Sequence, residues 1–326
     1  MKKTEKKSES MTAVKRWLKE NTIIYAVVFL AILLMIVSDK FATWSNFMNI
    51  MRQTSMVAII SIGAFYTIVG GGIDLSNSSI AGITGIFFAM AMVNWGLHPI
   101  LAILLALVSG AIFGGLNGAV IAYGAIPPFI ATLGMQIAAR GLCFVVTNAY
   151  PVTGLPKSVA FIGQGYLFDV IPVPVIIMIV VFIIMGFIAQ KTRYGRSVYA
   201  VGSNADGAHF AGIDTKKIKC MTYVISGVMA AIAAVILTVR VESGQPNGGL
   251  AWETDAITAA AIGGVSINGG KGNLLGVFLG ALFVGMLTNG MTLLDMNSYY
   301  QKIVKGVVLV RAIGIDSIRV ARANKA

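Results

Sequence analysis

Long apolar runs, separated by short polar stretches, follow one another along most of the chain. A helix that crosses the bilayer core of about 30 Å needs roughly 20 apolar residues, and ten runs approach that length. The pattern predicts an all-α integral membrane protein with about ten transmembrane helices. The eighth run is short and the second and third barely separate, so nine or eleven helices also fit. The predicted helices centre on residues 22–37, 55–71, 79–95, 99–123, 129–147, 171–189, 218–239, 254–267, 274–294 and 299–315.

Composition and charge support a membrane protein and suggest its orientation. The chain is 57% hydrophobic and only 12% charged, whereas soluble domains carry about 25% charged residues. Lys and Arg concentrate in cytoplasmic loops of membrane proteins, and an even number of helices places all the basic clusters, including both termini, on that side. We assign the net charge of +12 to contact with anionic lipid, not nucleic acid. The predicted divisions are a cytoplasmic basic tail at 1–20, a single transmembrane domain at 21–318 with a cytoplasmic loop at 190–217, and a cytoplasmic tail at 319–326.

Glycines recur at four-residue spacing in two of the predicted helices. One series is Gly110, Gly114 and Gly118, and the other begins at Gly272 and continues through Gly276 and Gly280. Small residues at this spacing allow helix backbones to approach closely. We favour packing within one subunit over a dimer seam.

Polar residues interrupt or enter several apolar runs, where they are costly and often mark a pathway. Residues 71–76 and 263–268 each pair two glycines with polar residues, a weak internal similarity that is typical of interrupted transporter helices. An ordinary turn is the alternative for both. Asn117 and Asn289 also suit structural hydrogen bonds between helices, and Gln136 and Arg140 allow either role.

Several chemistries are excluded by missing motifs. The chain has no Gly-x-x-x-x-Gly-Lys-[Ser/Thr] phosphate loop, no His-Glu-x-x-His and no Cys-x-x-Cys. Cys143 and Cys220 are predicted at different depths, so neither a disulfide nor a metal pair is expected. Acidic residues cluster at helix ends instead of midspan, which favours a permease driven by a partner. A stand-alone secondary carrier or channel for a small polar solute is the alternative, and a membrane-embedded enzyme or scaffold is a third.

Six runs of sequence resemble those of the ribose-type ABC importer permeases, the membrane subunits of bacterial uptake systems for ribose, xylose, galactose and related compounds. The resemblance extends from about Phe41 to Ser317, with the runs in order and at the family's spacing. They are GGIDLS (71–76), FIATLG (129–134), TRYGRSVYAVGSNADGAHFAGI (192–213), SGQPNGGLAWETDAI (243–257), IGGVSINGGKG (262–272) and SYYQKIVKG (298–306).

The resemblance implies the permease subunit of an ATP-driven importer for a monosaccharide or related small polar solute, in the bacterial cytoplasmic (inner) membrane. Such a subunit is not an enzyme and binds no cofactor or metal, because ATP and Mg²⁺ are held by the partner that hydrolyses ATP. The implied partners are a cytoplasmic ATP-binding protein, an extracytoplasmic solute-binding protein, a second permease copy as homodimer or paralogous heterodimer, and membrane lipid.

The resemblance also assigns roles to residues. It places the helix that couples to the ATPase in the polar, small-residue loop at 195–212, where the residues are Asn204, Ala205, Asp206, Gly207, Ala208, His209, Phe210 and Gly212. For a neutral sugar, hydrogen-bonding and aromatic groups suit a translocation path, and the candidates are Phe65, Tyr66, Asp74, Ser76, Gln136, Arg140 and Asn289. An outer loop predicted to face the binding protein contains Gln245, Pro246, Asn247 and Trp252, with a plain solvated turn as the alternative.

Overall fold

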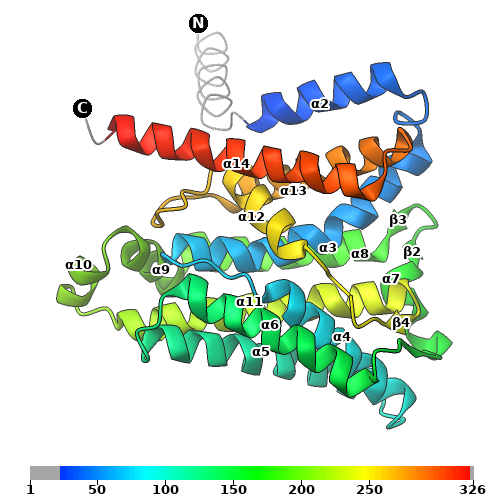
Figure 1. Cartoon of the computed structure of the whole chain (residues 1–326), viewed down its shortest axis with the longest axis horizontal. Coiled ribbons are helices and arrows are strands. Elements are labelled where there is room, and N and C mark those ends of the chain that lie inside the picture. The colour runs from blue at the N-terminus through cyan, green and yellow to red at the C-terminus, as the bar shows by residue number, and fades with distance from the viewer. Residues whose placement is uncertain (1–22, 324–326) are drawn as a thin grey trace, which may run out of the picture.

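The computed structural model describes residues 23–323 as a bundle of helices with two short antiparallel strand pairs (Figure 1). The predicted tail at 1–20 and residues 324–326 lie outside the described residues. The helices are α2 (Ile23–Val37), α3 (Trp44–Val69), α4 (Asn77–Val93), α5 (Pro99–Ala122), α6 (Pro128–Thr147), α7 (Ala160–Gln164), α8 (Val173–Lys191), α9 (Arg193–Ser203), α10 (Ala205–Phe210), α11 (Thr215–Arg240), α12 (Trp252–Ile262), α13 (Leu274–Leu293) and α14 (Ser298–Ala323), with a 3₁₀ turn at Lys157–Val159.

The two ends of the bundle carry different elements (Figure 1). Helices α9 and α10 lie at one end together with the C-terminal end of α14, and we call this the α10 end. The strands lie at the opposite, hairpin end. There β1 (Val152–Thr153) pairs antiparallel with β4 (Ser243–Gly244), and β2 (Tyr166–Leu167) pairs with β3 (Ile171–Pro172).

The all-α class is confirmed, whereas the helix boundaries differ from the prediction in three places. Six helices are long and apolar enough to cross a membrane, namely α3, α5, α6, α8, α11 and α13, while α2 and α4 are shorter apolar helices. Helix α3 begins at Trp44, eleven residues before the predicted start, because Thr43 caps it by accepting a hydrogen bond from the Asn46 amide. At the other terminus α14 continues to Ala323, into the predicted tail.

The segment between α3 and α4, residues 70–76, turns back into the bundle. Val69 ends α3 against Gly202 of α9, at the α10 end. Ser226 of α11 contacts both Gly63, six residues earlier in α3, and the Asp74 carboxylate. The segment therefore runs back alongside the last six residues of α3, a distance of about 9 Å. As a result, α4 begins inside the bundle.

A second segment, residues 245–251, enters the bundle from the hairpin end. Gly244 lies against Ala89 near the end of α4, and Gly249 lies against Ser78 in the first turn of α4. The segment therefore descends along α4 by about three helical turns. Helix α12 begins at Trp252, inside the bundle and close to the start of α4. Two interrupted helices thus begin near one another.

The predicted eighth helix at 254–267 extends too far, because α12 ends at Ile262. Gly263 caps α12 and Gly264 takes a φ of +83°, which ends the helix. The sequence similarity between 71–76 and 263–268 does not give the two segments equivalent places, since the first precedes α4, of 17 residues, and the second follows α12, of 11 residues. Residues that flank the two segments meet at the α10 end, where the Gly270 amide donates to the Val69 carbonyl at 2.9 Å.

Both glycine series pack helices within this chain, as predicted. A side chain on Gly110, Gly114 or Gly118 of α5 would overlap backbone atoms of α11. Likewise, side chains on Gly276 and Gly280 of α13 would overlap backbone atoms of Gly263 and Ala259, at the end of α12. Close approach at these positions fixes α11 as the central helix of the bundle, in contact with α3, α4 and α5.

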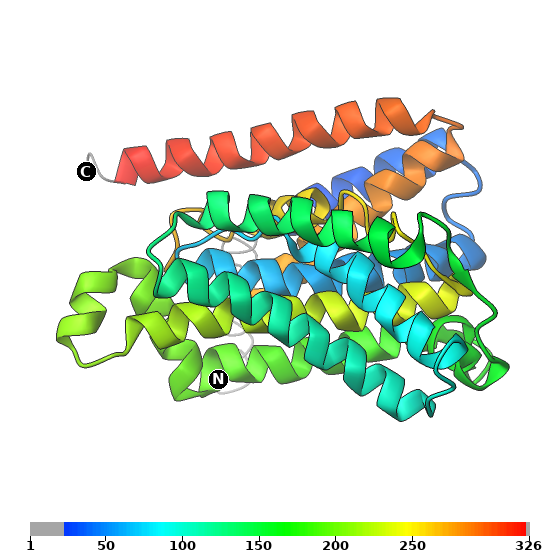
Figure 2. The ribbon, with the colours of Figure 1, turned by 60° about the horizontal axis from the view of Figure 1, so that its bottom comes forward.

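Helix α14 lies along one edge of the bundle in both views (Figures 1 and 2). Its contacts with the described helices are mainly with α12. The edge position of α14 leaves a cavity between this helix and the rest of the bundle, described below.

Candidate functional site

The carboxylate of Asp74 is completely enclosed at the turning point of residues 70–76. It accepts hydrogen bonds from the Ser76 amide at 2.9 Å, the Ser76 hydroxyl at 2.6 Å and the Ser226 hydroxyl at 2.6 Å. The Asn117 side chain of α5 donates to the Ser76 hydroxyl at 2.7 Å, so that hydroxyl is free to donate onward to Asp74. Two polar side chains of the segment itself, one of α5 and one of α11 therefore form one buried network.

We expect Asp74→Ala to destabilise the protein and to reduce solute uptake. The change leaves the Ser76 and Ser226 donors buried without their acceptor, at a cost of about 1–3 kcal/mol for each unsatisfied group. Thermal unfolding in detergent measures the first effect and uptake by cells measures the second. Asp206→Ala, an exposed position on α10, is the control for stability. An unchanged melting temperature in Asp74→Ala would show that the network does not stabilise the fold.

Arg140 of α6 holds the second interrupted helix in place. One guanidinium nitrogen donates to the carbonyls of Pro246 at 2.7 Å and Gly248 at 3.0 Å, and the other donates to the Ser78 carbonyl at 3.2 Å. Buried carbonyls in irregular backbone need such partners, because the bilayer core offers no water. Arg140 therefore joins the first turn of α4 to the segment that leads into α12.

The remaining predicted path residues lie in separate places. Phe65 and Tyr66 are buried in the core of the bundle, where the Tyr66 hydroxyl donates to the Met185 carbonyl of α8 at 2.7 Å. Asn289 of α13 exchanges two amide hydrogen bonds with Asn46 of α3, at 2.9 and 3.0 Å. Gln136 is half-buried on α6. The structure joins Asp74 to Ser76 but does not bring the seven candidates into one site, and their role in a path stays a prediction.

The predicted coupling segment forms a helix of its own. Asn204 caps α10 by accepting from the Gly207 amide at 2.9 Å, and Asp206 lies in the first turn. Ala208 is buried against the neighbouring elements, whereas Phe210 is 88% exposed at the tip. Gly212 ends the turn with a φ of +82°. A short helix is present within Asn204–Gly212, where the resemblance places the coupling helix, and its docking role stays a prediction.

The outer loop predicted to face a binding protein is mostly enclosed. Pro246 is buried, Gln245 donates from its side-chain amide to the Ser243 hydroxyl at 2.7 Å, and Trp252 begins α12. Asn247 is exposed. Contact between these four residues and another protein stays a prediction.

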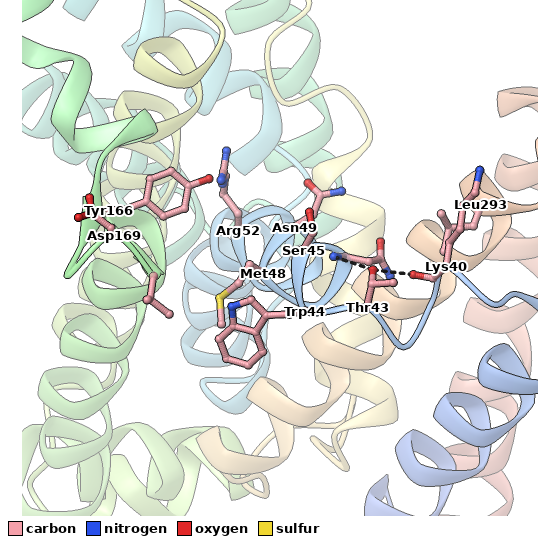
Figure 3. A pocket seen from close by; sticks show the side chains of 12 residues that line it. Lys40, Thr43, Trp44, Ser45, Met48, Asn49, Arg52, Tyr166, Asp169 and Leu293 are labelled. Carbon is pink, nitrogen blue, oxygen red and sulfur yellow. Dashed lines mark hydrogen bonds between the residues drawn. The ribbon is translucent and has the colours of Figure 1, made fainter.

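A cavity of about 640 Å³ opens at the hairpin end (Figure 3). None of its lining residues is among the site residues predicted from the sequence. Arg52 of α3 lies over the ring of Tyr166 with its guanidinium carbon 4.9 Å from the ring centroid. The polar start of α3 was the available signal, because residues 45–53 interrupt the apolar pattern with amides and an arginine. The lining consists of Lys40, Thr43, Trp44, Ser45, Asn46, Met48, Asn49, Arg52, Tyr166, Asp169, Val170 and Leu293.

A second cavity, of about 510 Å³, lies between α14 and helices α3, α11, α12 and α13. Asp255 of α12 and Lys305 of α14 meet in it, with the ammonium nitrogen 2.9 Å from the carboxylate oxygen. Among the residues that the structure describes, this is the one ion pair. We call this space the α12–α14 cavity. Its polar and aromatic lining residues are Gln53, Trp252, Thr254, Asp255, Thr288, Ser298, Gln301, Lys302 and Lys305.

Comparison with known proteins places this chain in a family. Residues 46–313 match the family described as branched-chain amino acid transport system / permease component. No solved structure matches the chain.

Individual relatives match over nearly the whole chain. The ribose import permease protein RbsC of Haemophilus influenzae is 38% identical, covering 96% of this chain and 97% of that protein. The D-allose transport system permease protein AlsC of Escherichia coli is 35% identical, covering 93% and 92%. The xylose transport system permease protein XylH of H. influenzae is 34% identical, covering 83% and 88%. The chain therefore belongs to the family of ABC importer permeases that includes these ribose, allose and xylose permeases.

Proposed function

We propose that this protein is the membrane-spanning permease subunit of an ABC importer that carries a monosaccharide into a bacterial cell. The similarity to sugar import permeases along nearly the full length of both chains carries the proposal. The missing phosphate loop agrees with it, because a permease of this kind relies on another subunit for ATP hydrolysis. That subunit would bind ATP and Mg²⁺, and a solute-binding protein would deliver the sugar from outside the cytoplasmic membrane.

We propose ten membrane-crossing segments, with the α10 end in the cytoplasm. Six long helices and the shorter α2 and α4 are apolar, and the interrupted α12 and the edge helix α14 complete the set. Lys and Arg residues near α9 and at the start of α11 concentrate at the α10 end, as expected of a cytoplasmic face. Labelling of single cysteines from either side of the membrane tests this orientation. Labelling of Asp206→Cys from outside the cell would show that the α10 end faces outward.

Helix α10 is the proposed contact with the ATP-binding subunit. It extends from the bundle between α9 and α11 and presents the exposed ring of Phe210. Its neighbour α9 contacts the end of α3 and the segment before α13, because Gly202 abuts Val69 and the Tyr199 hydroxyl donates to the Gly272 carbonyl at 2.9 Å. Movement of α10 can therefore reach the end of α3 and the start of α13 through α9.

ATP-dependent uptake in sealed proteoliposomes tests the function. The permease is reconstituted with an ABC-type ATP-binding protein and supplied with a solute-binding protein and labelled ribose, xylose or allose. We expect uptake that requires all three proteins and ATP. Uptake by the permease alone, without ATP or partners, would support the alternative of a stand-alone carrier.

We expect Gly207→Trp to uncouple ATP hydrolysis from uptake without preventing folding. The atoms nearest to a Cβ at this position belong to the exposed Asn204 side chain, at 3.1–3.5 Å. That side chain can shift, so the fold tolerates a side chain here, whereas an indole would obstruct a cleft that receives α10. The measurement is the ratio of sugar transported to ATP hydrolysed, with copurification of the ATPase as a second readout. Normal coupling in this variant would place the docking surface elsewhere.

A second copy of this chain, or a paralogous permease, completes the proposed assembly. Transport requires a closed path across the membrane, and a cavity at the edge of the bundle suits a path that is shared between two subunits. Cross-linking of single-cysteine variants of α14 in membranes checks this arrangement. Absence of any permease–permease product across several α14 positions would contradict it.

A further inference from the structure

We infer that the α12–α14 cavity is a binding site for a neutral sugar inside the membrane, and that the Asp255–Lys305 pair recognises the sugar hydroxyls. The inference rests on the proposed function and deepens it by naming the site. Neither the family match nor the names of the relatives assign a solute site to any residue of this chain.

The size and lining of the cavity suit a small polar solute. Its volume of about 510 Å³ lies within the range of about 300–1,000 Å³ that is typical of small-molecule sites. Carboxamide and hydroxyl groups of Gln53, Thr254, Thr288 and Gln301 line it from four different helices or helix starts. Such groups both donate and accept hydrogen bonds, as the hydroxyls of a sugar require.

An aromatic side chain contributes a flat apolar surface to the same cavity. Trp252 is half-buried at the first position of α12 and lines the cavity. An indole combines an apolar face with a polar N–H group, and the C–H face of a sugar ring packs well on such a surface. Trp252 and Asp255 are three residues apart in α12 and therefore lie on the same face of that helix.

The ion pair is unusual because charged residues are expensive within membrane-spanning segments. Asp255 and Lys305 are only 12% and 22% exposed as side chains, yet both line the cavity and do not pack entirely against protein. A charged donor or acceptor forms stronger hydrogen bonds than a neutral one. The pair thus presents a strong acceptor and a strong donor to the cavity while its own charge is balanced.

The balanced ion pair favours a neutral solute over an acidic one. Lys305 is neutralised by Asp255. Lys302 is exposed at the cavity, has no carboxylate partner among the described residues, and has its ammonium 5.8 Å from the ring centroid of Tyr299. Ser298 and the amides add no charge. A carboxylate or phosphate ligand would have to compete with Asp255 for Lys305, whereas the hydroxyls of a neutral sugar can bridge the two.

The test is protection of a cysteine in the cavity against a maleimide in membranes. Cys143 and Cys220 are first replaced by alanine, and ATP-dependent uptake by this background establishes the proposed function independently. Thr288→Cys then reports on the cavity. Thr292→Cys is the matched control, because Thr292 is one turn further along α13, makes the same hydrogen bond to the carbonyl four residues earlier, and does not line the cavity.

We expect saturating ribose, xylose or allose to slow labelling at Thr288→Cys several-fold and to leave Thr292→Cys unaffected. The corresponding sugar acid should give no protection. Unchanged labelling with every neutral sugar, in a background that still imports sugar, would overturn the site while leaving the function intact. Protection by the sugar acid alone would overturn the assignment to neutral sugars.

The second measurement addresses the ion pair. We expect Asp255→Asn to raise the KM of sugar uptake by about tenfold, the effect of losing one strong hydrogen bond to a charged group. Protection of Thr288→Cys should then require a correspondingly higher sugar concentration. An equal loss of maximal rate with KM and protection unchanged would show that the pair only joins α12 to α14. If Asp255→Asn does not fold, the protection experiment in the unmutated cavity still decides.

Discussion

Gly114→Leu is expected to prevent the accumulation of folded protein in the membrane. A Cβ on Gly114 would overlap the carbonyl oxygen of Tyr223 and approach the backbone of Gly227, so no side-chain rotation can relieve the contact. Helices α5 and α11 would have to separate, and α11 also contacts α3 and α4. Overpacking of a close contact costs about 1–3 kcal/mol where neighbours can move, and here the neighbours are backbone atoms.

The adjacent glycine provides the matched control. A Cβ on Gly115 would meet only Cγ2 of Val224, at 3.7 Å, which is an ordinary contact distance. Both substitutions place the same residue on the same helix, so insertion and hydrophobicity are equal. Size-exclusion chromatography and thermal unfolding in mild detergent compare the two. Equal yields and melting temperatures for Gly114→Leu and Gly115→Leu would show that α5 and α11 are not packed as closely as described.

Arg140→Met is the second change for which we expect a large effect, seen as a lower melting temperature and loss of uptake. Methionine keeps an unbranched apolar stem, although a shorter one, and removes three hydrogen bonds to carbonyl oxygens. Hydrogen bonds to a charged group each contribute about 1.5–3 kcal/mol. Two of the released carbonyls belong to the segment leading into α12, so the start of that helix loses its anchor.

Lysine at the same position separates charge from geometry. Arg140→Lys keeps the charge but replaces a planar fork of donors with a single ammonium group, which cannot reach three carbonyls in the same arrangement. We expect stability between that of the native protein and that of Arg140→Met. Arg193→Met, an exposed position on α9, controls for removal of an arginine. A melting temperature of Arg140→Met equal to that of the Arg193 variant would contradict the anchoring role.

The Arg140 prediction concerns the place where two interrupted helices meet. Helices α4 and α12 begin near one another inside the bundle, and Arg140 contacts the first turn of one and the segment before the other. The Asp74 network holds the segment before α4 on the opposite side of that helix start, against α5 and α11. A transporter with two such helix starts near its centre has polar backbone available where a solute crosses.

The glycine positions and the coupling segment could be predicted from local sequence. The four-residue spacing of Gly110, Gly114 and Gly118 places the three glycines on one face of a helix, which predicts close packing of another helix against that face. The family resemblance placed a helix in the polar loop between apolar runs, and Asp206 near its start suits a helix N-terminus. Asn117 and Asn289 were correctly considered as hydrogen-bonding groups between helices, although their partners were unknown.

The residues of the two cavities could not be found in the same way. Asp255 and Lys305 are separated by fifty positions, and the sequence around either residue does not reveal that the two form an ion pair. Trp252 and Gln245 were placed together in an outer loop, because proline, glycine and amides are typical of exposed turns. A segment of that composition can instead be buried when a distant side chain donates hydrogen bonds to its backbone carbonyls. Here that side chain is Arg140.

The sequence by itself determined that the protein is helical and embedded in a membrane, which helices approach closely, and to which family it belongs. These properties depend on hydrophobicity, residue size and local order, which are visible along the chain. Only the tertiary structure decided where helices are interrupted, which polar groups meet, and where a cavity forms. Those features depend on hydrogen bonds and charge pairs between distant segments, since inside a membrane each buried polar group is stable only beside its partner.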